Sequence, residues 1–135
     1  MKILTIGTFD LLHAGHMELF RYGNMLGKLI VGVNSDEFVE QYKGEPPAQC
    51  YEDRKNNIIR FASSSVYKND SSGKELIDRI KPHVILIGMD WHERDYLAQI
   101  GIETQYLDDN RIILIYAPRT TGVSTTAIKE GHGTA

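Results

Sequence analysis

The sequence has a single cysteine, Cys50, so an intramolecular disulfide is impossible. This scarcity fits a reducing compartment. Nothing around Cys50 marks it as a nucleophile, so we interpret it as an inert thiol. The first residues form an apolar stretch typical of a strand rather than the charged and apolar regions of a signal peptide. We therefore expect a cytoplasmic protein.

Long apolar runs and an excess of charge of one sign are also lacking. No stretch approaches the ~20 apolar residues that a membrane helix needs, so membrane insertion is not expected. The 15 Lys and Arg residues against 18 Asp and Glu residues leave a formal net charge of −3. A mildly acidic chain has no general attraction for nucleic acid. Any phosphate ligand must then be bound by a few well-placed groups.

Strand-like and helix-like segments alternate along the 135 residues. Short apolar stretches predict strands at 2–6, 29–33, 65–67, 84–87 and 112–116. Helices are predicted at 14–26, 51–62, 73–80, 94–100 and 124–130, with a short one opened by a capping-box spacing at 34–37. This order predicts an α/β domain with an open parallel sheet and helices on both faces. The length suits a single domain, 1–130, followed by a flexible tail, 131–135.

In such sheets, ligands bind at the carboxyl ends of the strands. After the first predicted strand come two histidines, His13 and His16, whose spacing puts them on one face at a helix start. Gly15 leaves no side chain between them, and Gly7 lets the backbone turn sharply and a ligand approach. The helix start adds unpaired N–H groups. The segment therefore predicts a polyphosphate site; a zinc site is the weaker alternative, because Asp90 or His92 would have to be the third ligand.

The segment after the last predicted strand is rich in hydroxyl groups and contains Arg119, Gly122, Ser124 and Thr125. An ordinary capped turn explains Ser124 but not the arginine, the glycine and the neighbouring threonines. Hydroxyls and N–H groups at a helix start suit phosphate oxygens, and arginine binds phosphate with two nitrogens. This segment is therefore a second candidate phosphate site.

The other strand ends allow more than one interpretation. Asp90, two residues after Gly88, can recognise a base amino group or a sugar hydroxyl, or cap a helix. Trp91 can stack on a ligand or fill the core. Lys43 and Arg54 can bind phosphate, although single cations of this kind are usually solvated surface residues.

The stretch from Gly7 to His16, with His13-Ala14-Gly15-His16 at its end, resembles the signature of the HxGH nucleotidyltransferase superfamily. Together with the stretch 119–126, it is similar to the cytidylyltransferases, and among them to those that act on glycerol 3-phosphate. Two features depart from that pattern. Met89 stands where a second acidic residue is usual, and the loop 43–47 has one lysine where the glycerol-3-phosphate enzymes have more. Both departures bear on the acceptor more than on the reaction.

The resemblance implies a Rossmann-like fold, a homodimer and magnesium. It implies that the domain 1–130 transfers CMP from CTP to glycerol 3-phosphate or a similar polyol, sugar or alcohol phosphate, with release of pyrophosphate. The acceptor phosphate is itself the nucleophile, so the protein must align two anions and neutralise the charge that develops.

The resemblance also assigns roles to single residues. It implies catalytic roles for His13, His16, Lys43 and Arg119. It implies nucleotide contacts at Gly7, Thr8, Phe9, Asp10, Gly15, Gly88, Asp90, Arg119, Gly122, Ser124 and Thr125. It places Asp36, Lys43, Arg54 and Trp91 toward the acceptor. The triphosphate would hold most of the Mg²⁺ coordination, with Asp10 as the candidate protein contact.

Two alternatives share these residues. An adenylyltransferase on the same fold would use ATP, and the histidines do not distinguish it from an enzyme that uses CTP. A regulatory nucleotide-binding module would keep the phosphate site without turnover, although the intact set of His13, His16, Arg119 and Ser124 argues against it.

Overall fold

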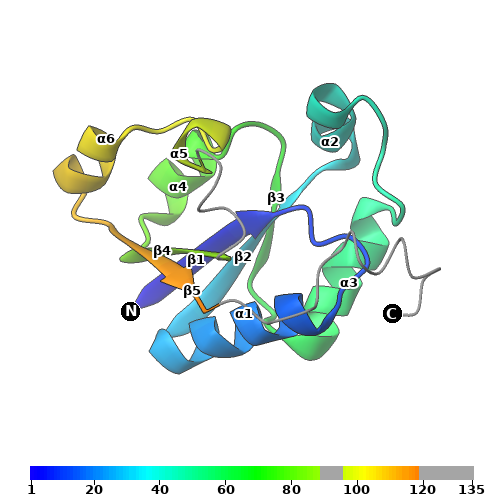
Figure 1. Cartoon of the computed structure of the whole chain (residues 1–135), viewed down its shortest axis with the longest axis horizontal. Helices are drawn as coiled ribbons and strands as arrows, with labels where there is room; N and C mark the ends of the chain where they lie inside the picture. Colours follow the sequence, from blue (N-terminus) through cyan, green and yellow to red (C-terminus); the bar gives the residue numbers. More distant parts are fainter. Residues whose placement is uncertain (89–95, 119–135) are drawn as a thin grey trace.

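The computed structural model describes residues 1–88 and 96–118. Strands and helices alternate along this part of the chain (Figure 1). The elements are β1 (Lys2–Gly7), α1 (Ala14–Leu26), β2 (Lys28–Asn34), α2 (Asp36–Lys43), α3 (Tyr51–Phe61), β3 (Val66–Asn69), α4 (Lys74–Ile80), β4 (Val84–Gly88), α5 (Tyr96–Gln99), α6 (Thr104–Asp109) and β5 (Ile113–Ala117).

The strands form one parallel sheet in the order β3-β2-β1-β4-β5. Strand order runs one way from β1 to β3 and the other way from β4 to β5, so the switch point lies between β1 and β4. Gly7 at the end of β1 pairs with Val33 of β2, and Leu4 pairs with Ile85 of β4. The predicted Rossmann-like sheet is confirmed, and the carboxyl ends of β1 and β4 mark its ligand-binding edge.

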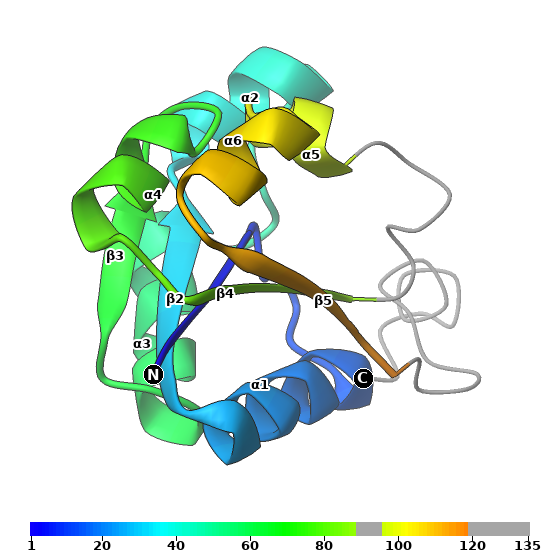
Figure 2. The same cartoon turned by 90° about the vertical axis from the view of Figure 1, so that its left-hand side faces the viewer.

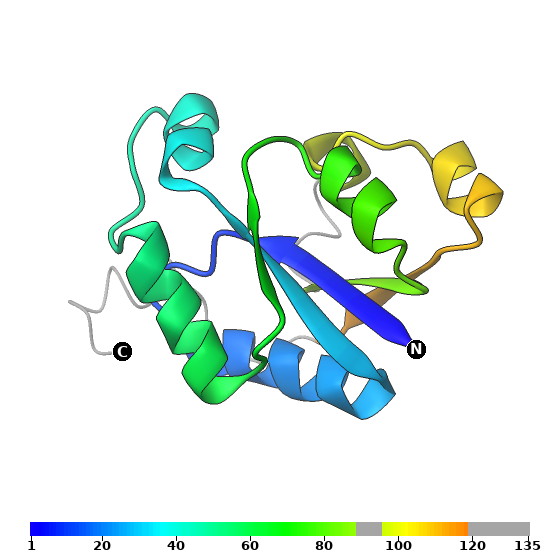
Figure 3. The same cartoon turned by 180° about the vertical axis from the view of Figure 1, so that it is seen from behind.

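Helices cover both faces of the sheet, as predicted. Successive strand residues point to opposite faces, and in β1 Leu4 packs with Ile77 of α4 while its neighbour Ile3 packs with Phe20 of α1. Figure 2 shows α1 on one side of the sheet and α4 and α6 on the other. From behind, β3 runs along the sheet edge between α3 and α4 (Figure 3). Two apolar layers therefore hold the helices on the two faces of the sheet.

The predicted bounds of α1 are confirmed at both ends. The helix stops at Gly27, where a Cβ would lie 2.5 Å from the main-chain oxygen of Met1. Only a residue without a side chain allows the N-terminal strand to pass this close to the helix end, so the glycine is a packing requirement.

Two local predictions were wrong. Ser35, not Asn34, caps α2, because β2 extends through Asn34 and the Ser35 Oγ then accepts from the Phe38 N–H at 3.1 Å. The pattern also missed α6, whose single buried residue, Leu107, gives no helical periodicity. The predicted helix at 124–130 and the tail at 131–135 lie outside the described residues, and no helix in the described part is long and apolar enough to cross a membrane.

Candidate active site

The two histidines of the HxGH motif build the start of α1. His13 is the N-cap residue, and its Nδ1 accepts from the Gly15 N–H at 3.0 Å. In return, Nδ1 of His16 accepts from the His13 N–H at 3.3 Å. This is a reciprocal capping box in which imidazoles replace the usual hydroxyl and carboxylate. The two rings stack with their centroids 3.9 Å apart and their planes at 24°.

The capping box fixes how each imidazole can act. A nitrogen that accepts from a main-chain N–H carries no proton, so the neutral rings of His13 and His16 carry theirs on Nε2. The Nε2 groups are therefore the donors that this pair can direct at a ligand. The expectation of unpaired main-chain N–H groups at this helix start is narrowed, because the imidazoles of the two histidines accept from the N–H groups of His13 and Gly15.

The sequence suggested that Gly7 makes the turn that leads to the histidines. The structure shows a different arrangement. Phe9 and Leu11 take the left-handed conformation, both with φ of 54°. A Cβ at Gly7 would lie 3.1 Å from the Phe9 ring, so the glycine makes room for that ring. Phe9 is buried against Phe20 and meets the His16 ring edge-on at 5.8 Å between centroids. The Phe9 side chain therefore supports His16 from the core.

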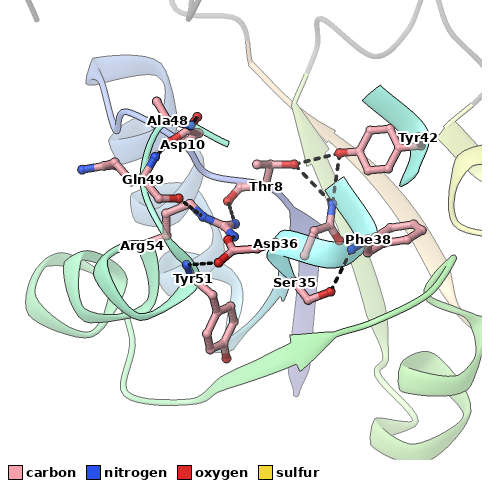
Figure 4. A network of polar contacts seen from close by, with 11 residues as sticks. Thr8, Asp10, Ser35, Asp36, Phe38, Tyr42, Ala48, Gln49, Tyr51 and Arg54 are labelled. Atoms are coloured by element: carbon pink, nitrogen blue, oxygen red, sulfur yellow. Dashed lines mark hydrogen bonds and ion pairs between the residues drawn. The ribbon is translucent and has the colours of Figure 1, made fainter. Parts of the chain in front are cut away.

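Asp10 anchors the loop that precedes α3. Its carboxylate accepts from the N–H groups of Ala48 at 2.7 Å and Gln49 at 2.9 Å. The Gln49 side chain accepts from the Leu11 N–H at 3.0 Å in the opposite direction. These contacts clamp the histidine-bearing segment against the loop (Figure 4).

Arg54 lies inside the protein, whereas the resemblance had placed it toward the acceptor. Its side chain is fully buried. The three guanidinium nitrogens donate to the main-chain oxygen of Thr8 at 2.7 Å, the main-chain oxygen of Gln49 at 3.0 Å and the Asp36 carboxylate at 2.7 Å. The other Asp36 oxygen accepts from the Tyr51 N–H at 3.2 Å. Arg54 thus joins β1, the loop and α2, and Asp36 is committed to the same network (Figure 4).

We predict that Arg54→Met destabilises the fold by about 2–4 kcal/mol, because it leaves buried acceptors without their donor. Arg54→Lys should recover part of this loss, since an ammonium lacks the planar fork that reaches three acceptors. Urea unfolding measures the change. Arg60→Met, an exposed arginine on the same helix, is the control and should change stability by less than about 0.5 kcal/mol. A stable Arg54→Met variant with only a raised KM for the acceptor would contradict this internal role.

A second polar cluster joins Thr8 to α2. The Thr8 and Tyr42 hydroxyls share a hydrogen bond of 2.8 Å, and the Asn34 amide donates to them at 3.3 Å and 3.5 Å. Asn34 is buried, and its oxygen accepts from Asn69 at 2.9 Å. Sequence reasoning missed Asn34 and Tyr42, although a buried polar residue at the end of an apolar strand is itself a signal.

Tyr51 begins α3, next to Asp36 and Arg54. Burial raises the pKa of its hydroxyl above the ordinary value, because the charged phenolate is poorly solvated there. The Lys68 ammonium lies 4.6 Å from the ring centroid. Sequence reasoning did not single out Lys68, which comes from the edge strand β3.

The structure brings Thr8, Asp10, Asp36 and Arg54 into one contact network at the carboxyl edge of the sheet. Gly88 ends β4, the strand next to β1. The other candidates, Asp90, Trp91, Arg119, Gly122, Ser124 and Thr125, lie outside the described residues. Within the described ranges, no group of three His, Cys, Asp or Glu side chains could hold a metal ion.

Comparison with known proteins agrees with this geometry. A family model described as cytidylyltransferase-like matches residues 4–131. Glycerol-3-phosphate cytidylyltransferase of Bacillus subtilis is 36% identical over 134 residues, covering 96% of this chain and 95% of that protein. The enzyme of the same name from Staphylococcus aureus is 35% identical, covering 96% and 92%. FAD synthase of Pyrococcus horikoshii is 38% identical over 94 residues, covering 67% and 64%.

The fold has solved counterparts as well. The crystal structure of a lipopolysaccharide core biosynthesis protein from Thermoplasma volcanium superposes with a TM-score of 0.70 at 19% identity, covering 89% of this chain and 98% of that one. This likeness supports the sheet and its helices. The family match spans the HxGH capping box and nearly the whole described chain, and the protein therefore belongs to the cytidylyltransferase-like family.

Proposed function

We propose that this protein transfers CMP from CTP to a phosphorylated alcohol and releases pyrophosphate. The observation that carries the proposal is the stacked pair His13 and His16, whose capping box engages both Nδ1 atoms and so puts the proton of each neutral ring on Nε2. The glycerol-3-phosphate cytidylyltransferases among its relatives make glycerol 3-phosphate the first acceptor to test.

The reaction needs no covalent bond between the protein and the substrates. An oxygen of the acceptor phosphate attacks the α-phosphorus in line, and the bond from that phosphorus to pyrophosphate breaks. Positioned donors lower the barrier by meeting charge as it develops. His13 and His16 would donate from Nε2 to phosphate oxygens, and Lys43 would add a cation from the end of α2. Arg119, Ser124 and Thr125 remain candidates for the triphosphate.

Further features belong to the proposal. Mg²⁺ would neutralise phosphate charge when bound, and the donor set fits a metal that arrives with the triphosphate. The Asp10 oxygens each accept one main-chain N–H, so each keeps a lone pair that can serve as a ligand. The catalytic unit would be residues 1–130, acting in the cytoplasm, which the single cysteine fits, and as a homodimer, which the family implies.

The test of the proposal is the choice of nucleotide. We expect kcat/KM for CTP to exceed that for ATP by about 100-fold, because a pocket closed around a pyrimidine excludes the larger purine by overlap. UTP should lose roughly 1–3 kcal/mol for each buried polar group that it leaves unpaired. Pyrophosphate release measures all three nucleotides, with glycerol 3-phosphate, sugar phosphates and phosphocholine as acceptors.

The likeness to FAD synthases, whose product contains an adenine nucleotide, makes ATP the second candidate. Equal efficiency or an advantage for ATP would assign this protein to the adenylyltransferases and leave the histidine assignment intact. CTP binding in calorimetry without turnover of any acceptor would instead indicate a regulatory nucleotide-binding module.

A further inference from the structure

The end of α2 places a tyrosine and a lysine at the ligand-binding edge. Tyr42 and Lys43 are its last residues, and Gly44 stops the helix in a left-handed conformation with φ of 85°. A Cβ at Gly44 would meet nothing within 4 Å, so the glycine serves the backbone conformation alone. Because the chain leaves the helix directly after Lys43, the last helical turn determines where this lysine lies.

The two ends of α2 are anchored differently. The N-terminal end is held by the Ser35 cap and by the ion pair between Asp36 and Arg54. Near the C-terminal end, the hydrogen bonds from the Tyr42 hydroxyl to Thr8 and Asn34 tie the last turn to the sheet. Among the described residues, no other side chain of this last turn, residues 40–43, forms a hydrogen bond to the sheet or to the segment that follows β1.

The ring of Tyr42 is fixed on more than one side. Its hydroxyl meets the Thr8 hydroxyl at 2.8 Å, and its ring packs on Phe38, one turn earlier, at 5.0 Å between centroids. The Lys43 ammonium lies 5.9 Å from the Tyr42 ring centroid, within the ~6 Å reach of a cation–π contact. Tyr42 is still 40% exposed, so it is no ordinary core residue.

We propose that Tyr42 is a positioning residue that holds Lys43 in place for phosphate charge at the site, an inference that rests on the proposed transferase function. The Tyr42 hydroxyl fixes the ring to Thr8 at the end of β1, and the ring and the last turn of α2 then set the direction of the lysine. Thr8 opens the segment that leads to His13, so this link ties the cation to the frame that carries the histidines.

The test is a double-mutant cycle on kcat/KM for CTP. Tyr42→Phe keeps the ring and removes the hydroxyl, and it should lower kcat/KM about five- to tenfold, the size expected for one lost hydrogen bond. In a Lys43→Met background the same change should cost less than about twofold, because the residue being positioned is gone. Tyr67→Phe, at an exposed tyrosine on β3, is the matched control and should leave kcat/KM and Tm unchanged.

A second measurement does not depend on turnover. Reductive ¹³C-methylation labels the lysines, and Lys43→Arg identifies the Lys43 signal by its disappearance. In the wild type this signal should be shifted by the Tyr42 ring, and in Tyr42→Phe it should move toward the position of the exposed lysines.

Equal losses from Tyr42→Phe in both backgrounds, or an unmoved Lys43 signal, would overturn the proposal. A wild-type protein that turns over no nucleotide would instead contradict the proposed function. In that case the Lys43 signal would still decide whether Tyr42 positions the lysine.

Discussion

Replacing either His13 or His16 by alanine is expected to lower kcat by about 10²–10³, the usual cost of one lost donor to a developing oxyanion. Both imidazoles accept through Nδ1 from the helix backbone, so the proton of each neutral ring is on Nε2, the nitrogen that we propose donates to substrate. The effect should fall on kcat more than on KM, because the donors matter most when charge develops. Rapid-quench or pyrophosphate-release assays measure it.

The capping role calls for variants that separate stability from catalysis. His13→Ala also removes an N-cap acceptor, which should cost about 1 kcal/mol of stability. His13→Asn offers its amide oxygen in place of Nδ1, and His16→Gln restores the reach-back of a capping box. We expect both replacements to recover Tm without recovering kcat. Alanine variants that turn over within a few-fold of the wild type, or rate recovery in His13→Asn, would refute the catalytic role.

The parts of the site that sequence predicts are those that local rules determine. The bounds of α1 follow from its apolar periodicity and from Gly27, and the structure reproduces them. The spacing of His13 and His16 predicts that they meet on one face, and their rings do stack. That both residues cap the helix through Nδ1 is harder to foresee, because histidine is an uncommon capping residue and the choice of nitrogen depends on side-chain rotamers.

The rest depends on contacts between segments that are distant in the chain. Arg54 looks like an ordinary exposed cation on a helix, and its burial follows from acceptors on Thr8, Gln49 and Asp36 that converge only in the folded chain. Gly7 looks like a turn residue, yet its constraint is the ring of Phe9 two residues later. No periodicity or spacing rule encodes either contact.

Magnesium removal is expected to abolish turnover. A divalent cation on the transferring phosphates supplies several kcal/mol of charge stabilisation, so excess chelator should lower the rate by about 10³-fold or more. Pyrophosphate release with and without chelator measures this, and added Mg²⁺ should restore the full rate. Full activity in excess chelator would contradict the expectation.

We further expect the triphosphate, rather than the protein alone, to hold the metal. Mg²⁺ commonly binds proteins through one or two carboxylates plus substrate phosphates, and Asp10, the candidate protein contact, offers one remaining lone pair on each oxygen. Calorimetry should therefore detect no tight Mg²⁺ binding without nucleotide, and the half-saturating Mg²⁺ concentration should rise with the CTP concentration. Asp10→Asn should loosen the loop and lower activity, yet leave this dependence on CTP unchanged. Tight binding to the nucleotide-free protein, lost in Asp10→Asn, would instead place the metal on the protein.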